Sequence, residues 1–177
     1  MLKIFRLRSE VYREINYNNE FPDIINGLNF DDYDENSAIL YTKIDDIVTG
    51  TCRVIFDSDK KLPIDSHFSL DYLRLQHKDI AEVSRLTVKH SNIGLNQEFK
   101  WLTRGVYLIT IKNSIRKTVS ALKSEHFKLY SKFGGLKIEK KFDIYGELPN
   151  ISIITLWDAS QISNFFKKAF LEKSEVA

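Results

Sequence analysis

The sequence predicts an α+β fold: a single domain over residues 1–177, with a central, mostly antiparallel sheet flanked by helices. Strand-like apolar runs fill the middle and the end of the chain, and helical periodicities separate them without a strict alternation. No repeat, linker or composition shift marks a second domain. With 43% hydrophobic and 28% charged residues in 177, the chain has enough apolar mass for a full core.

The first half of the chain predicts a helix, a hairpin and a further strand. Apolar residues recur at helical spacing in the first segment, and an Asn-rich stretch with one Pro and one Gly then predicts a loop. Two β-rich runs separated by Asp45-Asp46 predict the hairpin. The expected bounds are a helix at 5–15, a loop at 16–29, strands at 37–44 and 47–56, a polar turn at 57–61 and a strand at 80–89.

The second half predicts three helices interleaved with strands. Apolar residues recur every three or four positions from Phe99 to Ile109, and Gly134-Gly135 end the next helix. Gly105 costs its helix about 1 kcal/mol relative to Ala, so a neighbouring element is expected to pack closely there. The expected bounds are a helix at 96–112, a strand at 119–122, a helix at 125–133, strands at 136–145 and 151–157, and a helix at 159–171.

Charge is unevenly distributed, although the net charge is only +2. Residues 20–35 hold six acids and no Lys or Arg, whereas residues 100–141 hold eleven bases and two acids. A basic surface suits an acidic protein, nucleic acid or membrane phosphates, and solvated helix faces have the same composition. No apolar run is long enough to span a membrane, and residues 1–8 lack the features of a signal peptide, so a cytoplasmic protein without a transmembrane segment is expected.

Several reaction classes are disfavoured by what the sequence lacks. It contains no GxxxxGK[ST], GxGxxG, HExxH or GxSxG motif. The single Cys52 excludes an internal disulfide and a multi-cysteine zinc site, and inside a strand it is expected to be a small buried residue rather than a nucleophile. The four histidines have no metal-ligand spacing, so neither a metal nor a cofactor is expected.

A set of charged residues lies within or beside apolar elements: Arg8, Asp31, Asp34, Arg53, Glu82 and Arg85. A charge in a buried strand is costly unless it is paired, so these groups are expected to pair with one another, in a catalytic site or in a structural ion-pair network. Strand alternation places Glu82 and Ser84 on one face and Arg85 on the other. Glu82 and Arg85 therefore join one cluster only if the strand bulges between Val83 and Leu86, and bulges are frequent beside active sites.

These motifs resemble one family as a set. They are Leu7-Arg8-x-x-Val11-Tyr12, Phe30-Asp31-Asp32-Tyr33-Asp34, Gly50-Thr51-Cys52-Arg53 and Glu82-Val83-Ser84-Arg85. Their spacing resembles that of the acyl-homoserine lactone synthases, the autoinducer synthases of quorum sensing, over residues 8–157. The strand Glu82-Val83-Ser84-Arg85-Leu86-Thr87-Val88 is more similar to that of a sister group, the N-acyl amino acid synthases. The resemblance implies a GNAT-like fold with a splayed sheet.

The resemblance also implies an activity, the transfer of a fatty acyl chain from acyl-carrier protein to an α-amine. The acceptor is S-adenosylmethionine, with lactonisation to follow, or alternatively an amino acid such as tyrosine. Glu82 assists deprotonation of the amine through water, and Arg85 and Arg53 complete the catalytic set. The implied substrate-binding residues are Arg8, Tyr12, Asp31, Asp34 and Ser84. This chemistry needs a base for the ammonium and N–H groups for the oxyanion, both of which a splayed strand can supply.

The expected donor is a carrier protein because residues 90–96 contain one Gly and no Arg, and so lack a Gly-rich turn for the pyrophosphate of coenzyme A. Carrier proteins are acidic, which suits the basic excess in residues 100–141. The candidate contacts are Arg104, Arg116, Lys117, Lys123 and Lys128. Phe99, Leu102, Val106 and Ile109 are candidates for an acyl pocket, although plain core residues have the same spacing.

Two other functions remain open from the sequence. One is a coenzyme A-dependent acetyltransferase acting on another amine. The other is a non-catalytic nucleic-acid-binding module that uses the basic face, although no helix-turn-helix or aromatic RNA-binding motif is present. The sequence does not determine the acyl length or the oligomeric state.

Overall fold

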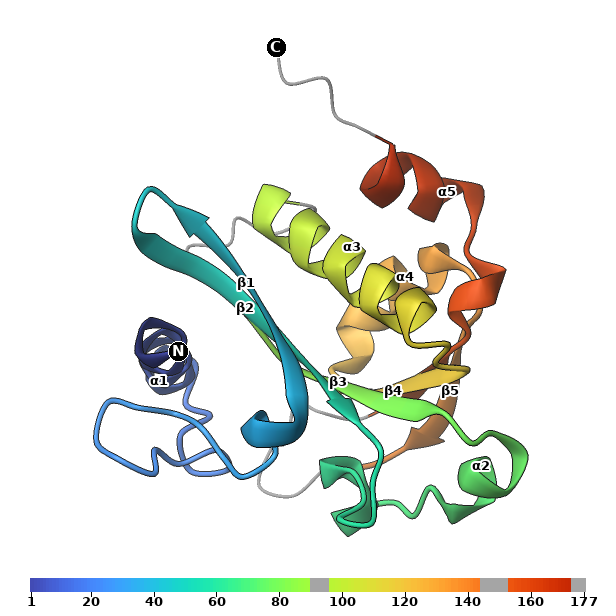
Figure 1. Cartoon of the computed structure of the whole chain (residues 1–177), viewed down its shortest axis with the longest axis horizontal. Helices are drawn as coiled ribbons and strands as arrows, with labels where there is room; N and C mark the ends of the chain where they lie inside the picture. Colours follow the sequence, from blue (N-terminus) through green and yellow to red (C-terminus); the bar gives the residue numbers. More distant parts are fainter. Residues whose placement is uncertain (90–95, 144–152, 173–177) are drawn as a thin grey trace.

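The structure, a computed structural model, describes residues 1–89, 96–143 and 153–172. Its centre is a six-stranded sheet in the order β1-β2-β3-β4-β6-β5 (Figure 1). The strands are β1 (Ser37–Ile44), β2 (Ile47–Phe56), β3 (Ile80–Val88), β4 (Lys117–Leu122), β5 (Leu136–Lys141) and β6 (Ile153–Trp157). Every neighbouring pair is antiparallel except β3 and β4, which are parallel. The expected central, mostly antiparallel sheet is confirmed.

Helices pack on both faces of the sheet. The helix α1 (Leu2–Glu14) packs against β2 and β3, and α3 (Gln97–Lys112) packs against β1 and β2 from the other side (Figure 1). Each face has its own core because strand side chains alternate: Val54 lies in the core under α3, and Ile55 lies in the core on the opposite face. Asn96 begins α3, where its side chain accepts a hydrogen bond from the Phe99 amide at 2.7 Å.

The remaining helical segments are short. They are η1 (Asp34–Asn36), η2 (Pro63–Ser66), α2 (Asp71–Gln76), η3 (Ser124–His126), α4 (Phe127–Tyr130), η4 (Ser131–Phe133), η5 (Ala159–Gln161), α5 (Asn164–Phe166) and η6 (Lys167–Leu171). The predicted helix at 125–133 corresponds to three consecutive turns, η3, α4 and η4. The prediction of one helix over 159–171 is wrong, because the chain is extended at Ile162 and Ser163, and the Ser163 hydroxyl then caps α5.

The connection between β2 and β3 holds two short helices, η2 and α2, that the sequence analysis did not predict. Their apolar side chains Leu62, Ile64, Leu70 and Leu73 are buried in the core opposite α3. Each turn buries only one or two apolar residues, which is too few for a helical periodicity to be visible in the sequence.

The strands β3 and β4 separate after a short parallel pairing that ends at Glu82 and Val119. Just beyond this point, β3 bulges against β2. Ser84 pairs with Arg53 and Thr87 with Thr51, so Arg85 and Leu86 together face Cys52. The bulge predicted between Val83 and Leu86 is therefore confirmed, and Arg85 lies in the left-handed region with φ of +55°.

Two further expectations are confirmed. A Cβ at Gly105 would lie 3.0 Å from a methyl carbon of Leu40 on β1, which is the close approach expected there. Cys52 is buried, and burial raises the pKa of its thiol to about 12. In the described ranges, no helix has the length and apolar character that crossing a bilayer requires.

Candidate active site

A cavity of about 1040 Å³ passes through the opening between β3 and β4. Consecutive residues of β3, from Glu82 to Val88, line one side, and the end of β4 with Lys123 lines the other. Asp31, Arg53 and Glu82 form a polar part of its wall on the α1 side of the sheet. On the α3 side the wall is apolar and includes Phe99, Val106, Tyr130, Phe133 and Trp157. The cavity therefore joins a charged chamber to an apolar one.

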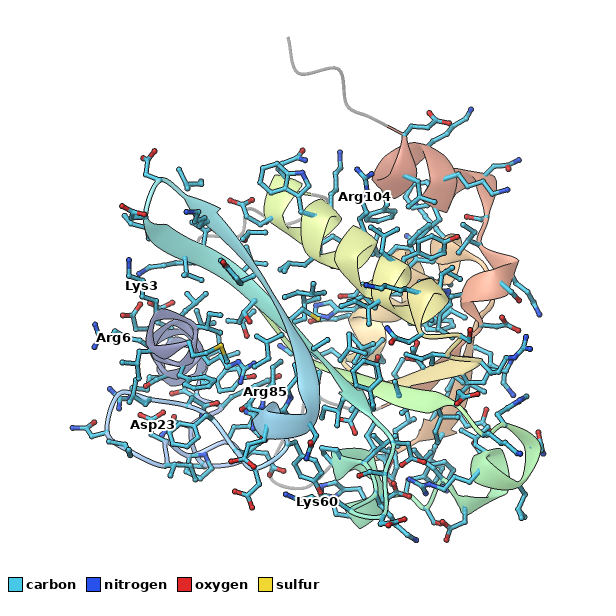
Figure 2. All side chains as sticks on the ribbon, viewed as in Figure 1. Lys3, Arg6, Asp23, Lys60, Arg85 and Arg104 are labelled. Carbon is cyan, nitrogen blue, oxygen red and sulfur yellow. The ribbon has the colours of Figure 1, made fainter. Side chains whose placement is uncertain are left out.

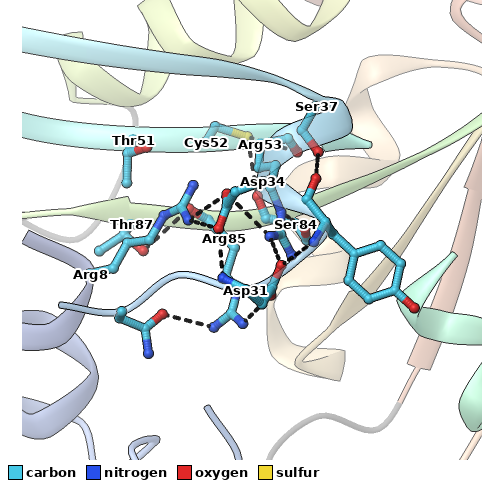
Figure 3. A network of polar contacts seen from close by, with 12 residues as sticks. Arg8, Asp31, Asp34, Ser37, Thr51, Cys52, Arg53, Ser84, Arg85 and Thr87 are labelled. Carbon is cyan, nitrogen blue, oxygen red and sulfur yellow. Dashed lines mark hydrogen bonds and ion pairs between the residues drawn. The ribbon is translucent and has the colours of Figure 1, made fainter. Parts of the chain in front are cut away.

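Charged residues from four distant segments converge in the polar chamber (Figure 3). Arg53 Nη1 on β2 lies 2.5 Å from Asp31 Oδ1, and Arg85 Nη2 on β3 lies 2.8 Å from Asp31 Oδ2. The bulge makes this possible, since it turns Arg85 toward the same carboxylate that Arg53 contacts. Burial tends to raise the pKa of Asp31, but the two guanidinium groups outweigh it and lower the pKa to about 2. Asp31 is therefore ionised throughout the physiological range.

Arg8 and Asp34 form the part of this network that lies behind the cavity wall. Arg8 on α1 is fully buried, and its Nη1 lies 2.8 and 3.0 Å from the two oxygens of Asp34. Asp34 also contacts Arg53 at 3.2 Å and accepts a hydrogen bond from the Asp31 amide at 3.0 Å. Neither Arg8 nor Asp34 lines the cavity. The contacts of Asp34 hold Asp31 and Arg53 in place, and Arg8 in turn holds Asp34.

Glu82 lies at the point where the strands separate, and its side chain is 5% exposed. Its Oε2 accepts a hydrogen bond from the Ile64 amide at 2.9 Å. Glu82 lines the cavity, and within the described residues no hydrogen bond reaches its Oε1. Burial raises the pKa of Glu82 to about 7, against the opposing effects of the Ile64 amide and Arg53. A carboxylate with this pKa suits proton transfer near neutral pH.

The other predicted substrate-binding residues, Tyr12 and Ser84, line the cavity. Ser84 Oγ accepts a hydrogen bond from Arg53 Nε at 3.2 Å. The guanidinium of Arg85 lies 5.4 Å from the Tyr12 ring and 4.3 Å from the Phe21 ring. The cavity wall here combines a fixed positive charge with aromatic surface.

Sequence reasoning missed three residues of the site. Asn29 is buried and accepts a hydrogen bond from Arg85 Nη1 at 3.2 Å, Phe21 stacks on Arg85, and Ile64 holds Glu82. Phe21 and Asn29 fall in the stretch that was predicted only as a loop. The Ile64 contact is made by a backbone amide, which carries no sequence signal, although Pro63 marks the start of a helical turn at that point.

The five predicted carrier-protein contacts do not lie together. Arg104 is on α3, far from Arg85 in the polar chamber of the cavity (Figure 2). Arg116 and Lys117 lie at the start of β4, roughly 20 Å of strand from Lys123, and Lys117 is bound to Asp158 at 2.7 Å. Lys123 lines the cavity and Lys128, on α4, is exposed. Of the five candidates, Lys123 is the one that lines the cavity.

Of the four acyl-pocket candidates, Phe99 and Val106 line the cavity. Leu102 is a core residue, and Ile109 packs against the core. Residues 90–96 carried the expectation against coenzyme A, and all of them except Asn96 lie outside the described residues. In the described parts of the chain, no group of three or more His, Cys, Asp or Glu side chains is placed to hold a metal ion.

Comparison with known proteins identifies the family of the chain. The model of the family "N-acyl amino acid synthase FeeM" matches residues 3–157. The chain is similar to the structure of FeeM, an N-acyl amino acid synthase from uncultured soil microbes, with a TM-score of 0.68 and 19% identity over 86% of this chain and 84% of that one. No curated protein matches the chain.

Two further solved structures share the fold. The structure of BjaI, a coenzyme A-dependent acyl-homoserine lactone synthase described with SAM and isopentyl-CoA, has a TM-score of 0.68 and 16% identity, covering 96% of this chain and 79% of that one. An aminoglycoside 6′-acetyltransferase of type Ii has a TM-score of 0.54 and 13% identity, covering 89% and 90%.

The split sheet, the cavity through it and the carboxylate at the split define an acyltransferase of GNAT-like fold. The chain belongs to the FeeM family of N-acyl amino acid synthases, because that family's model matches most of its length. Membership of an enzyme family leaves no ground for the nucleic-acid-binding alternative.

Proposed function

We propose that this protein transfers a fatty acyl chain from acyl-carrier protein to the α-amine of an amino acid, forming an N-acyl amino acid. One observation carries the proposal: the cavity lined by Glu82 continues into an apolar chamber across the divide between β3 and β4. Such a cavity can hold an amine at one end and an acyl chain at the other, with the thioester at the divide between them.

The proposed reaction needs no metal and no cofactor. The ammonium group of the acceptor gives a proton to Glu82, directly or through one water, and the free amine attacks the thioester carbonyl carbon. The C–N bond forms first and gives a tetrahedral intermediate with an oxyanion; its collapse breaks the C–S bond, and the leaving thiolate takes the second proton of the attacking amine. The proposed donors to this oxyanion are backbone N–H groups of β3 beyond Glu82, where β4 no longer pairs with β3.

An amino acid is preferred over S-adenosylmethionine as the acceptor because the family model is that of an N-acyl amino acid synthase. The sequence analysis ranked S-adenosylmethionine first, on the spacing of the charged residues. These residues do not separate the two acceptors, since an α-ammonium group next to Glu82 is common to both. The acceptor is therefore decided by experiment.

The donor is proposed to be a carrier protein because its acidic surface suits Lys123 and Lys128 beside the cavity. Acyl-carrier proteins are cytoplasmic, and the enzyme is accordingly proposed to act there.

The test is product analysis. Purified protein is incubated with palmitoyl-carrier protein or palmitoyl-coenzyme A, together with either a mixture of amino acids or S-adenosylmethionine, and the products are separated by mass spectrometry. We expect an N-acyl amino acid from the carrier protein, and loss of product in Glu82→Gln but not in Glu35→Gln, a change at an exposed carboxylate outside the cavity. An acyl-homoserine lactone would assign the other acceptor, and no product from any combination would overturn the proposal.

A further inference from the structure

The hydrogen bond to Glu82 comes from a segment outside the charged cluster. Ile64 lies in η2, between β2 and β3, and its amide donates to Glu82 Oε2 at 2.9 Å. The Ile64 side chain is fully buried, so this amide cannot move without disturbing the core. While Oε2 is held in this way, no hydrogen bond within the described residues reaches Oε1. Whatever fixes Ile64 therefore fixes the direction of the Glu82 carboxylate.

Asp65, the next residue, determines the shape of the turn that carries Ile64. Its Oδ2 accepts a hydrogen bond from the Leu62 amide at 3.0 Å, and its Oδ1 accepts one from the Leu70 amide at 2.9 Å. One carboxylate thus satisfies the backbone on both sides of η2. Burial tends to raise the pKa of Asp65, but Arg74 and these two amides outweigh it and hold the pKa below its usual range.

Arg74 on α2 ties this turn to the sheet. Its Nη1 and Nη2 lie 2.7 and 2.6 Å from the two oxygens of Asp65. Its Nε and Nη2 also lie 2.8 and 2.7 Å from the two oxygens of Asp57, which directly follows β2. Arg74 therefore makes two bidentate, charge-assisted contacts, which are stronger and more directional than single ion pairs. A Lys cannot reproduce them, since it carries a single point charge in place of a planar fork.

We propose that Asp65 and Arg74 are positioning residues for acyl transfer: through the Ile64 amide they keep the Glu82 carboxylate aimed into the cavity. This inference rests on the proposed function, because that function makes Glu82 the proton acceptor. Neither residue needs to touch the reacting atoms. Their loss releases the turn, so the charged form of Glu82 loses a hydrogen-bond donor and its oxygen loses a fixed direction.

The experiment compares Arg74→Met, Arg74→Lys and a matched control, Asp71→Asn. Asp71 is half exposed and contacts Lys61 and Arg74, but its change leaves the Arg74 contacts with Asp57 and Asp65 intact. The pH profiles of kcat and of kcat/KM are measured for each protein, and the Glu82 carboxyl is titrated by ¹³C NMR, with Glu82→Gln used to assign its signal.

We expect Arg74→Met to lower kcat at neutral pH by about tenfold and to raise the apparent pKa of the acid limb, and the NMR pKa of Glu82, by about one unit. Arg74→Lys gives an intermediate shift and Asp71→Asn gives none. A folded Arg74→Met variant with a lower melting temperature but with both pKa values unchanged would overturn the inference. If Arg74→Met does not fold, the same comparison is made with Arg74→Lys. Failure of the proposed function is seen separately, as wild-type protein that shows the NMR titration but makes no product.

Discussion

Asp31 joins Arg53 on β2 to Arg85 on β3, with one carboxylate oxygen for each guanidinium, at 2.5 and 2.8 Å. Both arginines are nearly inaccessible to solvent, at 2% and 9% side-chain exposure, and Arg53 also contacts Asp34 at 3.2 Å. Removal of the Asp31 charge is expected to cost more than the loss of a surface ion pair, because it takes the carboxylate partner from the buried Arg85 and leaves Arg53 with Asp34, which also pairs with Arg8.

Asp31→Asn is expected to destabilise the fold by about 3 kcal/mol, since breaking a buried pair leaves a partner charge without compensation. The measurement is urea unfolding at neutral pH. Asp32→Asn is the matched control: its side chain is 91% exposed and lies 3.5 Å from Lys60, so its stability is expected to stay within about 0.5 kcal/mol of wild type. Equal effects for the two variants would show that the cluster contributes little to folding.

The raised pKa of Glu82 makes stability and activity depend on pH in opposite directions. Its ordinary pKa is 4.5, and burial raises the folded-state pKa to about 7. The folded protein therefore binds the proton more tightly, and the stability this provides is present below about pH 4.5 and is lost as pH rises through 7. Activity is expected to rise over the same range, because the ionised form accepts the proton.

Glu82→Gln tests this dependence directly. The variant cannot ionise, so its stability relative to wild type is expected to increase by about 3 kcal/mol between pH 4.5 and pH 8, while its turnover falls by at least about 100-fold. Chemical denaturation at several pH values measures the change in stability, and the rate of product formation measures the turnover. A stability difference between Glu82→Gln and wild type that does not vary with pH would mean that the pKa of Glu82 is not raised in the folded protein.

Val106 on α3 offers a test of the apolar chamber. It is 6% exposed and lines the cavity, so Val106→Phe is expected to reduce the space for the acyl chain and shift the preference toward shorter donors by about tenfold in kcat/KM. Leu108→Phe, at a half-exposed position on the same helix, is the control and should leave the preference unchanged. An unchanged chain-length profile in Val106→Phe would place the acyl chain elsewhere.

Lys128 tests the carrier-protein surface. It is exposed on α4, and His126 and Tyr130, two residues before and after it in the sequence, line the cavity. Lys128→Glu is expected to raise KM for acyl-carrier protein about three- to tenfold at low salt, and to leave kcat with a short acyl-pantetheine donor unchanged. Lys43→Glu, on the edge strand β1, reverses an exposed charge at a different site and should have no effect. The same rise in KM in both variants would indicate an effect of the net charge of the protein rather than a docking surface at Lys128.

Much of the fold and most of the site were predictable from the sequence because their signals are local. Apolar, β-rich runs predict β1 and β2, and Asn96 begins α3. The bulge at Arg85 was predictable for a different reason. A charged residue on the wrong face of a buried strand has to be turned toward a partner, and an extra residue in β3 does this.

The sequence by itself determined which residues carry charge inside apolar elements, and hence that they would pair. Only the tertiary structure decided which of them line the cavity: Asp31, Arg53 and Glu82 do, whereas Arg8 and Asp34 do not. It also supplied Asn29 and the Ile64 amide. The physical reason is that pairing follows from the cost of a buried charge, a property of the residue, whereas access and backbone contacts depend on where β3 and β4 separate.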